Sequence, residues 1–184
     1  MLGCHDGIPL LDLKGLLQEE EIQSLIERIV SRGGMVKNLH GQKNLYYQVN
    51  ATYYSALGAS DEKMLLARAI QMFMPGKPQV WYLDLFAGKN DHEAVQRAGE
   101  SGHKEINRTN LSTDQITEGL KKDVVQKQLA LIRMRNTHKA FSEGAEVAIS
   151  GGERSLEIRW EYNSAFATLY VNFESGTYTI VESK

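Results

Sequence analysis

The spacing of the apolar residues changes near residue 146, and this change divides the chain into two parts. Beyond it, apolar and polar side chains alternate strictly in two runs, 156–162 and 167–173. Strict alternation is typical of an antiparallel sheet with one face in water. A turn at 174–177 and a last apolar run follow, so the sequence predicts a β module of roughly forty residues at this end.

Ahead of this module the apolar residues recur at helical spacing. The run 22–30 carries them at positions i, i+3, i+4, i+7 and i+8, and Gly33 follows. This pattern predicts an amphipathic helix that ends before the glycine. A second helix is expected over about 61–73, and a third over about 113–137 with a break near Gly119.

Two segments of the first part are predicted to be strands of a parallel sheet. The run 79–88, QVWYLDLFAG, is apolar without alternation, as in a strand buried on both faces. The opening segment is interpreted as a strand that ends at His5-Asp6-Gly7, where the glycine allows a turn. From spacing alone the triplet is either an ordinary loop entry, which is the more frequent case, or the mouth of a site where His5 and Asp6 meet a ligand. The stretch 35–58 between the first two helices is interpreted as a long polar loop. Two parallel strands cannot bury both faces of a sheet, so further strands are expected from outside these residues.

The composition excludes several classes of function. With 21 basic and 23 acidic residues intermixed and a formal charge of −2, the chain has no field that would gather nucleic acid or an anionic membrane. Cys4 is the one cysteine and cannot form an internal disulfide, and no secretory leader opens the sequence, so a cytoplasmic setting is expected. His92, His103 and His138 show no ligand spacing with each other or with Cys4, so no metal site and no cofactor are expected.

Four segments carry a resemblance to a known family: CHDGI, YYQVNATYYSALG, FMPGKPQVWYLDLFAGKND and EINR. Their order and spacing resemble the carboxyl end of sucrose phosphorylase and its relatives, the glucosyl phosphorylases of the α-amylase superfamily. The resemblance implies an α/β fold in which residues 1–141 form the seventh and eighth βα units of a (β/α)8 barrel. Residues 142–184 would then be the C-terminal β domain. A partial barrel accounts for the incomplete sheet.

The activity implied by the resemblance is retaining glucosyl transfer from a sugar to inorganic phosphate. In such enzymes one carboxylate forms a covalent glucosyl intermediate and a second carboxylic acid protonates the leaving oxygen. The resemblance implies that Asp6 stabilises the transition state by holding the 2- and 3-hydroxyls of glucose, and that His5 and Arg108 bind the same sugar. Tyr47 and Gln48 match the pair on the acceptor-side loop, where the leaving group or phosphate is met.

The acceptor-side loop departs from the family pattern. Enzymes that act on plain sucrose carry an aspartate two residues before the tyrosine, where this chain has Leu45. The same loop offers His40 and Lys43, cations suited to binding the phosphate of a phosphorylated fructose. Both sucrose and sucrose 6'-phosphate therefore remain candidate donors.

The nucleophile and the acid of the family lie on earlier barrel strands, and no residue of this chain matches them. The chain by itself is therefore expected to be inactive. A barrel cut open exposes strand edges and apolar interior, so self-association is also expected. The alternative interpretation is a non-catalytic carbohydrate-binding or interaction module derived from such an enzyme.

Overall fold

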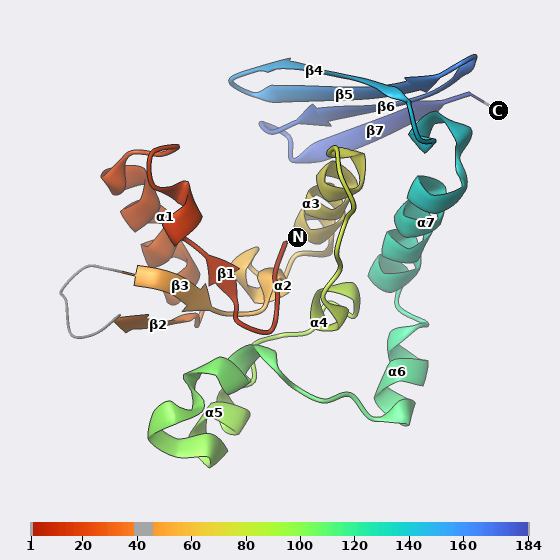
Figure 1. Ribbon diagram of the computed structural model, residues 1–184. Coiled ribbons are helices and arrows are strands. Elements are labelled where there is room, and N and C mark those ends of the chain that lie inside the picture. The colour runs from red at the N-terminus through yellow and green to blue at the C-terminus, as the bar shows by residue number, and fades with distance from the viewer. Residues whose placement is uncertain (1, 39–45, 184) are drawn as a thin grey trace. The chain divides into compact units, whose positions relative to one another are not determined.

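The computed structural model describes residues 2–38 and 46–183 (Figure 1). The chain divides into two compact units, each assembled from two stretches. The first unit consists of Met1–Ser60 and Val80–Leu120, and the second of Asp61–Gln79 and Lys121–Lys184. Among the described residues, no helix is long and apolar enough to cross a membrane.

The first unit is built on a three-stranded antiparallel sheet. Its central strand, β3 (Tyr46–Asn50), pairs with β1 (Ile8–Pro9) on one side and with β2 (Met35–Asn38) on the other. Helix α1 (Glu19–Ser31) supplies the apolar stripe that was predicted from helical spacing. The buried residues that join α1 to the sheet are Leu10, Ile22, Ile26, Ile29, Val49 and Ala51.

Short helices complete the first unit. They are η1 (Leu11–Leu13), α2 (Tyr53–Ala56), α4 (Tyr82–Leu85), α5 (His92–Ala98), η2 (Gly99–Asn107) and α6 (Thr113–Gly119). The prediction of a helix broken near Gly119 is confirmed, because α6 ends there and α7 (Asp123–Thr137) follows.

The prediction of a strand over 79–88 is wrong. Residues 82–85 form the single turn α4 instead, and no strand is found in this segment. Asp84 lies in the middle of the run, is buried, and accepts a hydrogen bond from the backbone N–H of Tyr53 at 3.1 Å. An apolar run without alternation does not distinguish a buried strand from a buried helical turn, and here a tertiary contact decides between them.

The interpretation of 35–58 as a loop is also wrong, because this segment holds β2, β3 and α2. Two tyrosines and a valine are among the five residues of β3, and such residues favour strands. The resulting sheet is antiparallel, so the described part of the first unit contains no parallel strand pair. What the structure supports is an α/β chain with two antiparallel sheets.

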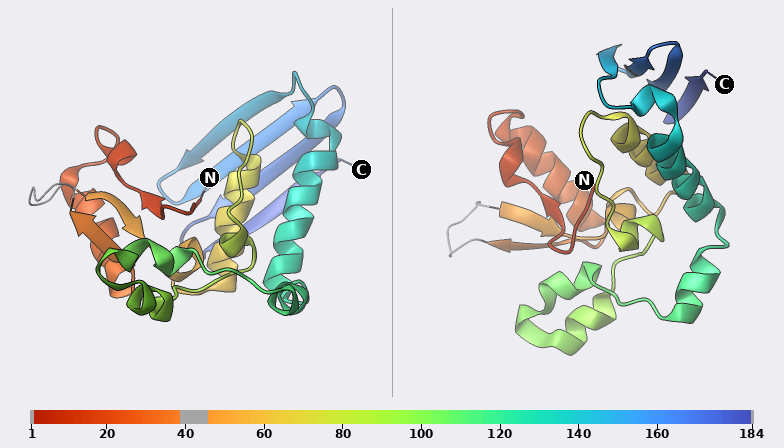
Figure 2. Two further views of the ribbon diagram at one scale, coloured as in Figure 1. Left: turned by 60° about the horizontal axis from the view of Figure 1, so that its bottom comes forward. Right: turned by 45° about the vertical axis from the view of Figure 1, so that its right-hand side comes forward.

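The second unit contains a four-stranded antiparallel sheet in chain order, which confirms the predicted β module. Its strands are β4 (Glu146–Gly152), β5 (Ser155–Tyr162), β6 (Ala165–Asn172) and β7 (Thr177–Glu182). Helix α3 (Asp61–Phe73), which was also predicted, packs on one face of this sheet with α7 beside it (Figure 2). The sheet and these two helices thus form one compact unit. The domain boundary expected after residue 141 stays a prediction about the whole protein.

Trp160 joins the sheet of the second unit to its helices. Its indole Nε1 donates to the carbonyl of Phe73, the last residue of α3, at 2.6 Å. The guanidinium of Arg135 lies 4.2 Å from the centre of the Trp160 ring and 4.7 Å from that of Phe141. Burial of this guanidinium lowers the pKa of Arg135. The buried indole of Trp160 therefore joins the sheet to α3 by a hydrogen bond and to α7 by the contact of its ring with Arg135.

Replacing Trp160 by phenylalanine is expected to lower the free energy of unfolding of the second unit by about 1–3 kcal/mol. The ring stays apolar, but the buried carbonyl of Phe73 loses its donor. Urea unfolding followed by circular dichroism measures the change. Tyr170→Phe, at an exposed position of the neighbouring strand, is the matched control and should change the value by less than about 0.5 kcal/mol. Equal effects of the two substitutions would contradict the role of the indole N–H.

Candidate active site

His5 and Asp6 lie at the tip of a tight turn in the first unit. The turn is closed by two backbone hydrogen bonds between Cys4 and Gly7, at 3.3 and 3.0 Å. Gly7 has a φ of +102°, and a Cβ there would lie 2.3 Å from the carbonyl oxygen of Val49. Only glycine fits this position. The described residues ahead of the turn form no strand, and the triplet leads into β1 rather than ending a strand.

Side chains from distant segments fix the backbone of this turn. The carbonyls of residues 4–6 each accept a side-chain hydrogen bond: in order, from Asn107 at 2.6 Å, Arg108 Nε at 2.9 Å and Asn50 at 2.7 Å. Asn50 ends β3, and Asn107 ends η2. Both asparagines are buried, with 0% and 1% of their surfaces exposed. Buried amides that bridge segments in this way restrict the turn to one conformation.

The carboxylate of Asp6 is held by two cations. Its Oδ1 lies 2.6 Å from Lys104 Nζ and 3.3 Å from Arg108 Nη2, and its Oδ2 lies 3.2 Å from His5 Nε2. The hydrogen bond from Lys104, together with the charges of Lys104, His5 and Arg108, lowers the pKa of Asp6 against a smaller opposing effect of burial. Asp6 is therefore a carboxylate at neutral pH.

Aromatic rings lie beside this cluster. The ring centres of Trp81 and His5 are 6.0 Å apart, and Trp81 Nε1 donates to the carbonyl of Asn107 at 3.3 Å. The hydroxyl of Tyr82 donates to the carbonyl of Thr109 at 2.6 Å, and burial raises the pKa of Tyr82. An apolar wall next to a few oriented polar groups is the usual composition of a small-molecule site.

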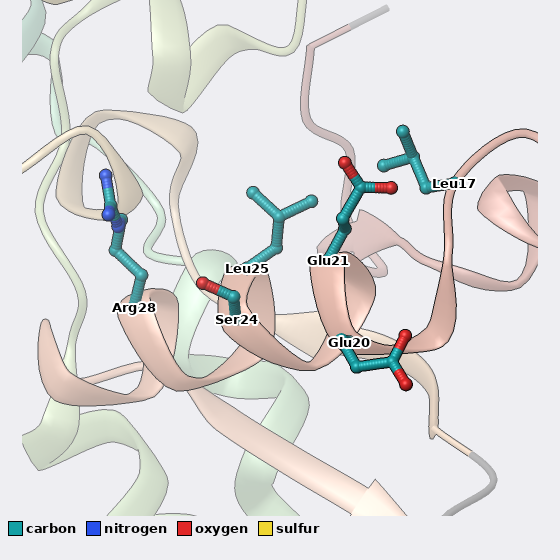
Figure 3. A pocket seen from close by; sticks show the side chains of 6 residues that line it. All are labelled: Leu17, Glu20, Glu21, Ser24, Leu25 and Arg28. Atoms are coloured by element: carbon teal, nitrogen blue, oxygen red, sulfur yellow. The ribbon is translucent and has the colours of Figure 1, made fainter.

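Arg108 contacts Asp6 and also lines a polar cavity. The cavity has a volume of about 570 Å³, and its lining includes Asp91, Arg97, Glu105, Arg108 and Thr109. A second cavity of about 480 Å³ runs along α1, where Leu25 and Leu17 lie among charged side chains (Figure 3). No residue of the Asp6 cluster lines the second cavity. The first cavity is therefore the better candidate for a ligand near Asp6.

The structure brings together three of the residues that the resemblance assigns, His5, Asp6 and Arg108, although Arg108 lies more than a hundred positions after the other two in the chain. Gln48 lies in β3, opposite Pro9, and is buried. His40 and Lys43 lie outside the described residues. Of Tyr47 only the backbone is described.

Sequence reasoning missed Lys104, Asn50 and Asn107. Lys104 and Asn107 stand with Arg108 in one short segment, KEINR, at spacing i, i+3 and i+4. In a helical segment this spacing places side chains on one face, so the signal was present in the sequence. Nothing in the sequence marks Asn50, because its partner carbonyl lies 44 residues away.

Cys4, His5 and Asp6 each offer a ligand atom, and these atoms lie within 4.8 Å of one another. Such a set could suit a metal ion by spacing alone. However, Lys104 and Arg108 already neutralise Asp6, and their charges repel a further cation. The residues present therefore fit a metal poorly, and the expectation of no metal site stays a prediction.

Comparison with known proteins identifies relatives along the whole chain, although no protein-family model matches it. The chain is 53% identical over 189 residues to a sucrose 6(F)-phosphate phosphorylase of Ilumatobacter coccineus, covering 98% of this chain and 36% of that protein. It is 39% identical over 199 residues to a sucrose phosphorylase of Agrobacterium vitis, covering 100% and 39%. The crystal structure of sucrose 6F-phosphate phosphorylase from Thermoanaerobacter thermosaccharolyticum matches with 38% identity and a TM-score of 0.93, covering 100% of this chain and 38% of that one.

These relatives are glucosyl phosphorylases, and that class accords with a carboxylate, an arginine and a histidine brought together beside aromatic rings. More closely, the chain is a partial homologue of the sucrose phosphorylase family, which confirms the resemblance. It spans between 36% and 39% of the length of the relatives described above.

Proposed function

We propose that the protein containing this chain is a retaining glucosyl phosphorylase that cleaves sucrose 6'-phosphate with inorganic phosphate to give α-glucose 1-phosphate. The observation that carries the proposal is the turn at residues 4–7, where His5, Asp6 and Arg108 meet in a homologue of sucrose phosphorylases. In this proposal residues 1–141 belong to the domain that contains a (β/α)8 barrel, and 142–184 form the C-terminal β domain of the same protein. Sites in such barrels lie at one end of the strands, on the connecting loops.

The proposed role of Asp6 follows from its charge. Positive charge develops on the sugar ring in the transition state of retaining transfer, and hydrogen bonds to the sugar hydroxyls strengthen there. An ionised carboxylate in a fixed position stabilises that charge without having to reorganise. The lowered pKa of Asp6 keeps the group ionised. His5 and Arg108 would bind the same sugar, and Tyr47 and Gln48 would meet the acceptor.

Sucrose 6'-phosphate is favoured over sucrose by two observations. The relative at 53% identity is a sucrose 6(F)-phosphate phosphorylase, whereas the sucrose phosphorylase described above is 39% identical. Leu45 also stands where enzymes for plain sucrose are expected to have an aspartate, and His40 and Lys43 precede it closely in the sequence. Replacing a fixed negative charge and adding cations favours a phosphorylated acceptor.

Initial rates of glucose 1-phosphate release, with sucrose and sucrose 6'-phosphate offered separately, test the proposal on the protein that contains this chain. We expect kcat/KM to be at least about tenfold higher for sucrose 6'-phosphate, and Lys43→Met to reduce that preference by about tenfold. Lys89→Met, at an exposed position outside residues 40–48, is the matched control and should leave the preference unchanged.

Each other outcome has a distinct meaning. A preference for sucrose would overturn the choice of donor but keep the reaction class. Release from neither donor would contradict the sucrose-type activity. In that case the non-catalytic carbohydrate-binding or interaction module becomes the better interpretation.

A further inference from the structure

Lys104 makes the shortest contact to the Asp6 carboxylate. Its Nζ lies 2.6 Å from Oδ1, whereas the nearest Arg108 nitrogen lies 3.3 Å from the same atom. Lys104 belongs to η2, 98 residues from Asp6 in the chain. A charge-assisted hydrogen bond of this length is among the stronger polar contacts in proteins.

Arg108 is less able to hold the carboxylate because its other nitrogens have other partners. Its Nε donates to the carbonyl of His5 at 2.9 Å, and its Nη1 lies 3.7 Å from Glu105 Oε1. The charge of Arg108 is therefore shared between two carboxylates and a carbonyl. The Lys104 ammonium, in contrast, makes its ion pair with Asp6 Oδ1.

The backbone contacts and the Lys104 contact constrain different degrees of freedom. Asn50, Asn107 and Arg108 fix the carbonyls of the turn, and with them the position of the Asp6 backbone. The carboxylate can still rotate about the side-chain torsions of Asp6, because the terminal torsion of an aspartate is broad. A cation on Oδ1 restricts that rotation and leaves Oδ2 on the side of His5.

We propose that Lys104 is a positioning residue for Asp6, holding Oδ1 so that Oδ2 is presented to the hydroxyls of the bound glucose. The inference rests on the proposed function of Asp6. Lys104 itself does not have to touch the sugar. Its effect on the reaction passes through the orientation and the charge of Asp6.

The pairing has a defined dependence on pH. Because the pKa of Asp6 is lowered in the folded chain, the pair stabilises the fold above the ordinary carboxyl pKa of 3.8. That stabilisation is lost as the pH falls through the folded-state pKa of Asp6. Removal of Lys104 takes away the first cause of the lowered value, so the pKa of Asp6 should rise.

The first test measures the ion pair without any assay of activity. The carboxyl carbon of Asp6 is titrated by nuclear magnetic resonance in the 184-residue chain and in Lys104→Met, Lys104→Arg and Lys89→Met. We expect the pKa of Asp6 to rise in Lys104→Met, to remain low in Lys104→Arg, and to be unchanged in Lys89→Met. An unchanged pKa in a folded Lys104→Met variant overturns the pairing. If Lys104→Met does not fold, a pKa of Asp6 that rises in the folded Lys104→Arg variant overturns it instead.

The second test measures the consequence in the phosphorylase that contains this chain. Lys104→Met should lower kcat about 10- to 100-fold with KM within about twofold, because a misoriented Asp6 loses contacts that strengthen in the transition state. Lys104→Arg should restore most of kcat. A rise in KM alone would overturn the positioning role. If the unaltered protein releases no glucose 1-phosphate, the proposed function fails, while the pKa measurement still decides whether the pair exists.

Discussion

Replacing Asp6 by asparagine in the protein that contains this chain is expected, under the proposed function, to lower kcat/KM for glucose 1-phosphate release about 100- to 1000-fold. Asparagine has nearly the same shape as aspartate, and its oxygen can still accept a hydrogen bond from Lys104. The turn should therefore persist, since the contacts that fix it involve backbone carbonyls. What is lost is the negative charge opposite the developing positive charge of the sugar ring.

The matched control is Asp12→Asn, which removes one carboxylate at an exposed position of η1 in the same unit. Its kcat/KM should stay within about twofold of the unaltered protein. Circular dichroism of both variants checks that the fold is retained. A folded Asp6→Asn variant with unchanged kcat/KM would remove Asp6 from the transition-state role and leave the turn as a structural feature.

Local patterns of the sequence were sufficient where a segment packs with one face. The apolar stripe of α1 and the alternation in β5 and β6 were correctly assigned from spacing. In β6 the inward residues Ala167, Leu169 and Val171 are nearly or fully buried, as strict alternation requires. In these elements one face is buried and the other is not, so the spacing of apolar residues is sufficient to predict both the type of element and its buried face.

Local patterns failed where distant residues decide the structure. The segment around Asp84 has the composition of a buried strand, but it forms the single helical turn α4. In that turn Asp84 accepts a hydrogen bond from the backbone N–H of Tyr53. The stretch 35–58 as a whole is polar enough to suggest a loop, yet β3 within it is the centre of a sheet because β1 and β2 flank it. Spacing within a segment does not record which other segments it meets.

The candidate site shows the same limit. His5 and Asp6 could be found from a short motif, because Gly7 marks the turn that carries them. The groups that hold the motif, Lys104 and Asn50, act across 98 and 44 positions of the chain. Folding therefore supplies the orientation of Asp6 and the cations around it, and neither is encoded in the dipeptide itself.

The 184-residue chain alone is expected to release no detectable glucose 1-phosphate from either donor. Retaining transfer needs a nucleophile and a proton donor on two carboxyl groups about 5 Å apart. A proton donor needs a raised pKa, whereas the pKa of Asp6 is lowered. Glu105 forms an ion pair with Arg108 at 3.7 Å. Asp6 is therefore unsuited to be the proton donor of this reaction.

The purified chain and the longer protein are assayed side by side, with circular dichroism to confirm that the chain is folded and sedimentation to test the expected self-association. Titration with glucose 1-phosphate, followed at the Asp6 carboxyl by nuclear magnetic resonance, distinguishes a chain that binds without turnover from one that does not bind. Turnover by the isolated chain that disappears in Asp6→Asn would contradict the prediction. It would require both catalytic carboxyl groups to lie within these residues, and the search for them would begin at Glu105 and Asp91, which line the cavity beside Arg108.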